Sequence, residues 1–316
     1  MRVVSSDEID RALAFPALIE ALAAAFRSDA VTPVRHHHEI PRPGGDGTLL
    51  LMPAWSGRGG GYLGVKVVTV FPGNAARGLA SVLGTYLLMD GDTGRPLAAL
   101  DGTRLTLWRT AAASALAAQA LAHPDATHMV MVGAGALAPF LIRAHRSVRP
   151  LETVSLWARE PAKAEALAAR LRDEGLPVSA APDLEAAVRQ ADVVSCATLA
   201  TEPLVSGEWL RAGAHLDLVG AFNLSMREAD DAALRRARIL VDTPAAHTEG
   251  GDVALGLKDG AITQGDIAGD LFALCRGAVE GRTAPDQITL FKSVGTALED
   301  LAAAVAVWER LDAAAP

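Results

Sequence analysis

Residues 129–145, "MVMVGAGALAPFLIRAH", decide the fold. An apolar run ends at Gly133, and Gly133, Gly135 and Ala138 then form a G-x-G-x-x-A pattern that opens a helical segment. In such a turn the first glycine permits the tight bend, the second lets the backbone approach a pyrophosphate, and the small third residue lets the helix pack closely. The helix N-terminus adds N–H donors for the phosphates. The segment therefore predicts a dinucleotide site whose cofactor-binding turn comprises Gly133, Ala134, Gly135, Ala136 and Leu137.

The sequence around this turn alternates between short apolar runs and helical patterns. Such alternation is typical of βαβ units and a doubly wound parallel sheet. We expect strands within 127–132, 153–158, 192–198, 215–222 and 238–242, and helices within 161–174, 183–191 and 228–237.

The first hundred residues have a different pattern. A helical start at 5–28 precedes strands that are separated by glycine-rich turns at 41–47, 56–61 and 90–94, which favours an antiparallel β-rich α+β unit. An alanine-rich helix over 106–122 leads into the second unit, and an amphipathic helix over 295–315 closes the chain. We therefore expect an α/β protein of two domains, 1–118 with 293–316 returning to it, and a Rossmann-type domain over 119–292.

Composition excludes several classes of protein. The chain has 316 residues and a net charge of -8, and its pI is near 5.5, so it lacks the concentrated basic character that nucleic-acid binding needs. Because no apolar stretch is long enough to span a bilayer and no signal-peptide pattern is present, we expect a cytoplasmic protein with no membrane partner.

Cysteine and histidine offer little chemistry. Cys196 and Cys275 lie in apolar segments and are expected to be core thiols. In "RHHHE" (35–39) successive strand residues point to opposite faces, so at most His36 and His38 could converge, and we predict no metal site. Glu249 and Asp252 flank a glycine turn, where helix capping is favoured over lining a cleft.

The end of the strand at 153–158 bears on the choice of nicotinamide cofactor. NAD sites usually place an acid here for the ribose 2′-hydroxyl, whereas an arginine suits a 2′-phosphate. Ala158 and Arg159 occupy this position, which favours NADPH with NADH still possible. Glu160 follows directly, so a shift of one residue in the strand end would restore the acid.

Three cations in the N-terminal half could bind an anionic substrate. Lys66 lies in the apolar segment "GVKVVTVFPGN" (64–74), in which both faces of a strand look buried. Arg35 and Arg109 offer planar forks that suit a carboxylate. Together the three predict a site for an amino- or imino-acid carboxylate, although each alone could equally be a surface residue, with Lys66 extending to water from a strand end.

Six segments, taken in order, resemble the ornithine cyclodeaminase and mu-crystallin family. They are "LGVKVVTVFPGN", "TGRPLAALDG", "LTLWRTAAASALAA", "VGAGALA", "VGAFNLSMREADD" and "TLFKSVGTALEDLA". The resemblance implies a homodimer in which the N-terminal domain, with the C-terminal helix, binds substrate and makes the dimer contact. It also implies that Arg35, Lys66 and Arg109 bind the substrate carboxylate, that Thr110 lies near the cofactor phosphates and that Ser293 lies near the nicotinamide.

Phe222 indicates which branch of the family the chain resembles. In the cyclodeaminases an aspartate lies six residues before a glutamate that aligns with Glu228, and here that place is Phe222, which can neither accept a proton nor stabilise a cation as a carboxylate does. The resemblance then favours the ketimine reductases, which reduce Δ1-pyrroline-2-carboxylate to L-proline or 1-piperideine-2-carboxylate to L-pipecolate. Lys66 becomes the candidate catalytic residue, since it could deliver the imine proton. Ornithine cyclodeamination, an alanine-type dehydrogenase and a non-catalytic NADPH-binding protein remain alternatives.

Overall fold

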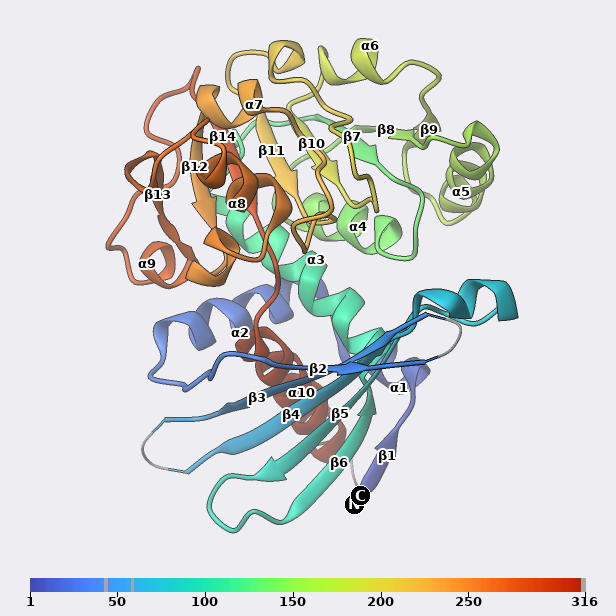
Figure 1. Ribbon diagram of the computed structural model, residues 1–316, viewed down its shortest axis with the longest axis vertical. Helices are drawn as coiled ribbons and strands as arrows, with labels where there is room; N and C mark the ends of the chain where they lie inside the picture. The colour runs from blue at the N-terminus through green and yellow to red at the C-terminus, as the bar shows by residue number, and fades with distance from the viewer. Residues whose placement is uncertain (43–44, 58–59, 314–316) are drawn as a thin grey trace. The chain divides into compact units, whose positions relative to one another are not determined.

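The structure is a computed structural model that describes residues 1–42, 45–57 and 60–313 (Figure 1). The chain divides into two compact units. Unit 1 comprises Met1–Thr110 with Thr296–Pro316, and unit 2 comprises Ala111–Gly295. The turns expected at 41–47 and 56–61 fall partly on residues 43–44 and 58–59, which lie outside the described residues.

Unit 1 is built on a six-stranded sheet. Strands β2 to β6 pair antiparallel in sequence order, and β1 pairs parallel with β6 at the edge opposite β2. The predicted antiparallel β-rich unit is therefore present. Its strands are β1 (Arg2–Val4), β2 (His36–Ile40), β3 (Gly47–Trp55), β4 (Tyr62–Val70), β5 (Val82–Asp90) and β6 (Pro96–Asp101), with a 3-10 turn, η1 (Pro72–Arg77), after β4.

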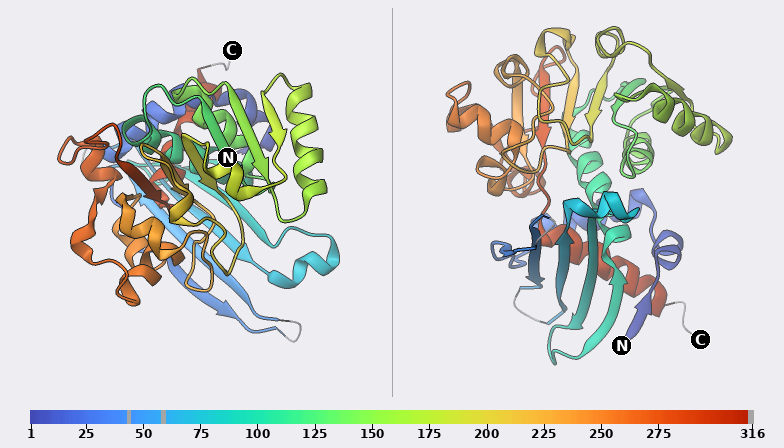
Figure 2. Two further views of the ribbon diagram at one scale, coloured as in Figure 1. Left: turned by 90° about the horizontal axis from the view of Figure 1, so that it is seen from above. Right: turned by 45° about the vertical axis from the view of Figure 1, so that its right-hand side comes forward.

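Three helices cover one face of this sheet. Helix α10 (Ala297–Asp312) contacts β3, β4 and β5 and also packs on α1 (Ser6–Ala12) and α2 (Phe15–Arg27), as the red helix in Figure 2 shows. The helical start expected over 5–28 is two helices rather than one. Pro16 is accommodated only in the first turn of a helix, so α2 restarts after an extended Ala14.

Helix α3 (Gly102–Leu121) carries the chain from unit 1 into unit 2. Its alanine-rich sequence has high helix propensity and contains no proline, so it continues without interruption. The division between the units falls after Thr110, inside this helix.

Unit 2 is an eight-stranded sheet in which every pair of neighbouring strands is parallel. The order β9-β8-β7-β10-β11-β14-β12-β13 reverses direction between β7 and β10, which confirms the doubly wound fold class. The strands are β7 (His128–Val132), β8 (Thr153–Trp157), β9 (Val178–Ala180), β10 (Val193–Cys196), β11 (His215–Leu218), β12 (Ala237–Val241), β13 (Ile267–Asp270) and β14 (Ile288–Lys292).

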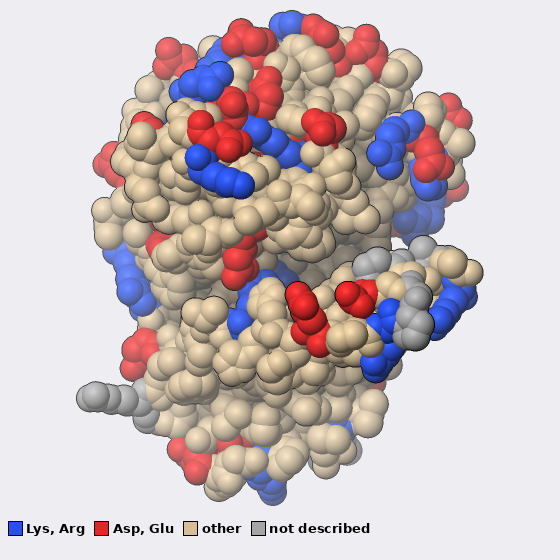
Figure 3. All heavy atoms as spheres, in the orientation of Figure 1, with Lys and Arg blue, Asp and Glu red and all other residues tan. Residues whose placement is uncertain are grey.

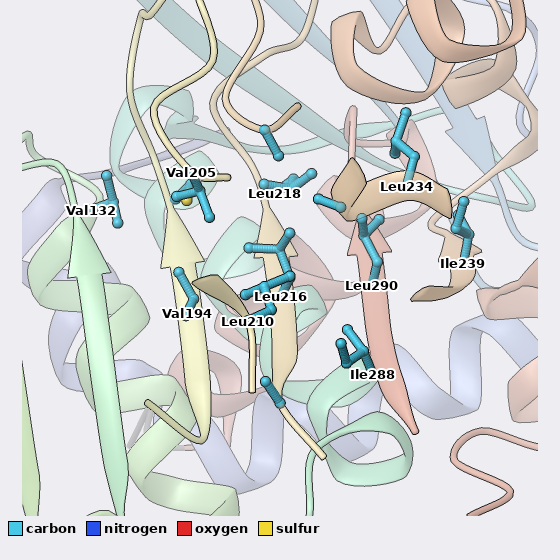
Figure 4. Close-up of a cluster of buried hydrophobic side chains, with 14 of the residues drawn as sticks. Val132, Val194, Val205, Leu210, Leu216, Leu218, Leu234, Ile239, Ile288 and Leu290 are labelled. Atoms are coloured by element: carbon cyan, nitrogen blue, oxygen red, sulfur yellow. The ribbon is translucent and has the colours of Figure 1, made fainter. Parts of the chain in front are cut away.

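Aliphatic side chains of the central strands form the core of unit 2. Val194, Leu216 and Leu290 project from β10, β11 and β14 in Figure 4 and are fully buried. The helices of the unit are α4 (Ala138–Val148), α5 (Pro161–Asp173), α6 (Leu184–Val188), α7 (Asp231–Arg236), α8 (Gly251–Lys258) and α9 (Leu271–Cys275), and its 3-10 turns are η2 (Gly207–Trp209), η3 (Pro244–His247) and η4 (Gln264–Asp266). The face of the molecule drawn in Figure 3 carries interspersed acidic and basic side chains.

Candidate active site

Unit 2 contains a pocket of about 610 Å³ at the carboxyl ends of its central strands. The pocket lies where the strand order reverses, between β7 and β10, and this is the position at which open α/β sheets bind ligands. Its lining comes from the turns after β7, β8, β10 and β11 and comprises residues 133–137, 157–160, 163, 197–200, 204, 219–220 and 222. The whole predicted glycine turn and both Ala158 and Arg159 are therefore part of one pocket.

The glycine turn is shaped to receive a ligand. Gly133 has φ +114°, a conformation that only glycine adopts readily, and a Cβ there would lie 2.6 Å from the carbonyl oxygen of Ala197. A Cβ on Gly135 would meet nothing within 4 Å, so the backbone at this position faces open space. Helix α4 begins beside it, and because the N–H groups of Ala138 and Phe140 already donate to Gly135 O and Leu137 O, the helix offers an anion its dipole rather than those N–H groups. These features fit a dinucleotide pyrophosphate.

Charged side chains line the pocket beyond β8. Arg159 and Lys163 both contribute to the lining, and Lys163 Nζ donates a hydrogen bond of 2.7 Å to Glu160 Oε1. This contact with Lys163, supported by the charge of Arg159, lowers the pKa of Glu160. The sequence analysis missed Lys163, although a second basic residue in the first turn of the helix expected over 161–174 was a usable signal.

Phe222 also lines the pocket, from the segment after β11. Its side chain is 45% exposed, so it is not a core residue at the strand end. An aromatic ring rather than a carboxylate thus occupies this part of the lining.

Two cofactor-binding predictions lie elsewhere on the chain. Ser293 follows β14, is 3% exposed and donates its backbone N–H to Leu218 O at 3.2 Å, and it does not contribute to the pocket lining. Thr110 is the last residue of unit 1, on α3. Both assignments remain predictions.

In unit 1, two of the predicted cations meet a pair of carboxylates from α10. Lys66 Nζ lies 2.9 Å from Asp300 Oδ1 and 2.7 Å from Oδ2, and Arg109 Nε donates to the same Oδ1 at 3.0 Å. Arg109 Nη1 donates to Glu299 Oε2 at 2.7 Å. All four side chains are at least nine-tenths buried. Lys66 therefore does not extend to solvent.

The sequence analysis missed Asp300 and Glu299. Both lie in the first turn of α10, where acidic side chains are common simply because they favour the helix dipole, so the sequence offered no distinct signal for a role at the cation site. The structure gives them one, since each is a direct partner of a predicted substrate-binding cation.

The surroundings of Lys66 make it a weak base. Burial, followed by the charges of Arg109 and Arg35, lowers the pKa of Lys66 to about 8, while Asp300 acts in the opposite direction. Arg35 is half-buried and lies directly before β2. A lysine with this pKa can exchange a proton near neutral pH.

Tyr86 is the neighbour of Lys66 on β5. The two residues are register partners in the β4–β5 pair, so their side chains share the face that the helices cover. Tyr86 is fully buried, and its hydroxyl has no hydrogen-bond partner among the residues that the structure describes. Burial, with a contribution from Asp300, raises the pKa of Tyr86 well above its usual value.

The remaining candidates show little chemistry. In the described part of the chain, no group of three or more His, Cys, Asp or Glu residues could hold a metal ion, and His36 and His38 are exposed on β2. Cys196 is buried in β10, where burial raises the pKa of its thiol well above its usual value, so it is an inert thiol. Within the described ranges, no helix combines the length and apolar character needed to cross a bilayer.

The fold and the pocket define a class of protein with a Rossmann-type dinucleotide-binding unit. Comparison with known families makes this more specific. The family model described as "Ornithine cyclodeaminase/mu-crystallin family" matches residues 1–315. The chain belongs to this family.

Individual relatives agree with the assignment. A Δ1-pyrroline-2-carboxylate reductase of Paracoccus denitrificans is 44% identical over 285 residues, covering 86% of this chain and 89% of that protein. The structure of the Thermococcus litoralis Δ1-pyrroline-2-carboxylate reductase in complex with NADH and L-proline has a TM-score of 0.93 at 33% identity, covering 99% of this chain and 98% of that one. An archaeal alanine dehydrogenase dimer with bound NAD has a TM-score of 0.90 at 29% identity, covering 99% and 97%.

Proposed function

We propose that this chain is an NAD(P)H-dependent oxidoreductase that reduces the C=N bond of cyclic ketimine carboxylates. The observation that carries the proposal is Lys66, a buried lysine with a pKa lowered to about 8 among other charged groups. A site of this kind both attracts a carboxylate and supplies a proton. The reductases among its relatives, at 44% and 33% identity, support the same chemistry.

The substrate carboxylate is expected to bind the cations of unit 1. Lys66 and Arg109 both contact Asp300, and the charge of Arg35 acts on the same lysine, so three positive groups act together at one place in unit 1. Arg35 and Arg109 orient the carboxylate through N–H donors. Lys66 holds the proton that keeps the imine nitrogen protonated.

The cofactor is expected to bind the pocket of unit 2. The 133–137 turn, beside the positive end of the α4 dipole, would hold the pyrophosphate, and the bound nicotinamide would supply the hydride that reduces the imine carbon. Because Arg159 and Lys163 both line the pocket, we expect NADPH to bind more tightly than NADH.

Δ1-Pyrroline-2-carboxylate is the first substrate to test, with 1-piperideine-2-carboxylate second. The two rings differ by one methylene, which a pocket discriminates by only about 1–3 kcal/mol. An alanine-type dehydrogenase is the second candidate, because an archaeal alanine dehydrogenase is similar over 99% of the chain.

The decisive test mixes the purified chain with NADPH and Δ1-pyrroline-2-carboxylate and follows the loss of nicotinamide absorbance. A parallel reaction contains NAD⁺ and L-ornithine and is assayed for ammonia. NADPH oxidation in the first reaction with no ammonia in the second supports the reductase. Ammonia in the second reaction without activity in the first would establish a cyclodeaminase and remove the significance given to Phe222. NADPH binding without turnover of any imino acid would indicate a binding protein.

We also expect a homodimer that forms through the sheet of unit 1. The face opposite the helices bears a groove of about 700 Å³ whose lining includes Val67, Thr69 and Leu83. Leu83 is 46% exposed and Val3 is 75% exposed, so this side of the sheet presents apolar surface to solvent in the single chain. Light scattering on the wild type and on Leu83→Asp tests the expectation: a dimer that the substitution dissociates supports it, and a monomeric wild type refutes it.

A further inference from the structure

Glu228 joins two of the segments that form the cofactor pocket. Its carboxylate Oε1 accepts hydrogen bonds from the N–H and hydroxyl of Thr198, at 2.7 and 2.8 Å. Oε2 accepts from the N–H groups of Gly220 and Ala221, at 2.7 and 3.3 Å. Thr198 follows β10 and Gly220 follows β11, and both line the pocket, whereas Glu228 does not. One carboxylate therefore ties together two turns of the pocket wall.

Gly220 permits this arrangement by having no side chain. A Cβ at this position would lie 2.4 Å from Glu228 Oε1, 2.2 Å from Thr198 O and 2.4 Å from Thr198 N. No ordinary side chain fits at those distances, so the turn after β11 closes directly on the carboxylate. The glycine, the carboxylate and Thr198 form one packed unit.

Asp252 and Lys292 form a buried ion pair, and Asp252 also binds the backbone of Glu228. Asp252, on α8, accepts hydrogen bonds through Oδ1 from the N–H groups of Glu228 and Ala229, at 2.8 and 3.0 Å. Its Oδ2 lies 3.2 Å from Lys292 Nζ at the end of β14. Asp252 thus does not have the helix-capping role favoured from the sequence, since it binds the Glu228 backbone instead.

The environment of Glu228 makes its charge sensitive to pH near neutrality. Burial, with the charge of Asp252 in the same direction and that of Lys292 opposing, raises the pKa of Glu228 to about 7. The Cys196 thiol also faces this cluster. The ionised carboxylate accepts these hydrogen bonds more strongly than the protonated group does, because protonation removes the negative charge and turns one oxygen into a donor.

We propose that Glu228 is a positioning residue whose ionised carboxylate holds the Thr198 and Gly220 turns in the shape that binds the nicotinamide dinucleotide, so that cofactor binding is coupled to loss of a proton from Glu228. This inference rests on the proposed cofactor function of the pocket. Glu228 acts through the pocket wall and does not itself touch the cofactor.

The test is calorimetric titration with NADH, which carries no ionising 2′-phosphate, in two buffers of different ionisation enthalpy. For the wild type we expect proton release on binding near pH ~7 and an affinity that falls several-fold between pH ~8 and pH ~6. Glu228→Gln should bind NADH weakly at both pH values and release no proton through this group. The control is Glu185→Gln, which removes an exposed carboxylate on α6 and should behave as the wild type does.

Thermal unfolding distinguishes positioning from a purely structural role. The pKa of Glu228 is raised from 4.5 to about 7 in the folded chain, so the folded state holds the proton more tightly than the unfolded state does. The contribution of Glu228 to the free energy of unfolding therefore falls as pH rises from 4.5 to about 7, while cofactor affinity should rise with pH. Glu228→Gln should abolish both trends. A merely structural glutamate would change stability without changing the pH dependence of NADH binding.

A milder variant keeps the inference testable if Glu228→Gln fails to fold. Thr198→Val removes the hydroxyl bond but keeps the charge of Glu228, so it should weaken NADH binding and retain the pH dependence. Wild-type affinity in Thr198→Val would overturn the inference, and so would wild-type affinity or undiminished proton release in Glu228→Gln. Failure of the wild type to bind either NADH or NADPH would instead overturn the proposed function.

Discussion

The two units each bury a cluster of charged side chains, and the clusters are satisfied in different ways. In unit 1, Lys66 and Arg109 are paired with the side chains of Asp300 and Glu299. In unit 2, the carboxylate of Glu228 is bound by backbone N–H groups and one hydroxyl. Side chains can exchange partners when a ligand arrives, whereas backbone groups that close a turn cannot do so without changing its shape.

The pKa shifts of Lys66 and Glu228 have the same main cause and opposite directions, because one group is a base and the other an acid. Burial disfavours the charged form in both clusters, so it lowers the pKa of Lys66 and raises that of Glu228. Both groups then ionise near neutral pH. A buried charge held by side chains is therefore suited to moving a proton, and one held by backbone groups is suited to holding a site in shape.

Lys66→Met should produce the largest effect on activity, because it removes the buried charge that we expect to move a proton. Loss of the acid and of one carboxylate-binding charge should lower kcat/KM for Δ1-pyrroline-2-carboxylate by about 10²–10⁴-fold. The fold should survive, because Asp300 keeps its contact with Arg109. The exposed Lys258→Met is the matched control and should retain activity. Near-normal kinetics for Lys66→Met would remove this residue from the mechanism.

Asp300→Asn should have the next largest effect, on both stability and pH dependence. Removing one partner from a buried ion pair costs roughly 3–5 kcal/mol in the free energy of unfolding, measurable by urea denaturation. Because Asp300 is the group that raises the pKa of Lys66, the variant should lower that pKa below about 8. The reduction rate, which needs protonated Lys66, should then decline at lower pH than in the wild type.

Glu299→Gln is the control for that experiment. Glu299 contacts Arg109, whereas the carboxylate that contacts Lys66 is that of Asp300, so loss of Glu299 should disturb the position of Arg109 and hence substrate binding, and should move the alkaline decline of the rate less than Asp300→Asn does. Equal shifts in the two variants would show that the cluster responds to total charge alone and not to the Lys66–Asp300 contact.

The sequence predicted the sheet of unit 2 best where local signals were strongest. The glycine turn after β7 and the alternating segments predicted β7, β8 and β10 because each strand is followed by a clear turn or helix. It did not predict β9 or β13, which have only three and four residues, and β14 was not recognised. Both β9 and β13 are edge strands and only partly buried, so they lack the continuous apolar run that marks the equally short but fully buried β10.

The site was predictable only where residue type alone carries the chemistry. Arg159 and the 133–137 turn could be singled out from the sequence because each residue type has a known relation to a dinucleotide, and the structure places them in the lining of one pocket. Asp300 and Glu228 could not be found in this way, since a carboxylate acts on Lys66 or on Thr198 only after the chain brings them together across 234 and 30 residues. Sequence spacing contains no information on those contacts.

Arg159→Ala tests an exposed charge, in contrast to the buried charges of Lys66 and Glu228. An exposed guanidinium makes weaker, salt-sensitive contacts, so we expect the Kd for NADPH to rise about tenfold, or about 1.4 kcal/mol, and that for NADH to stay unchanged. Lys163→Ala should have a smaller effect because Lys163 is paired with Glu160. Fluorescence titration with each cofactor measures the change. Equal losses for NADPH and NADH would show that Arg159 does not discriminate at the 2′ position.

Tyr86→Phe should have the smallest effect and tests how completely the unit 1 cluster is satisfied by its own side chains. The buried Tyr86 hydroxyl lies over Gly64 and has no hydrogen-bond partner among the described residues, so its removal takes away a desolvated polar group and should raise the free energy of unfolding by about 1 kcal/mol. Turnover should be unchanged if Lys66 and the arginines alone bind the carboxylate. Loss of activity accompanied by increased stability would instead mean that the hydroxyl forms a hydrogen bond with bound substrate. The hydroxyl would then have a partner only in the substrate complex. Urea denaturation and steady-state kinetics on the same preparation distinguish the two results.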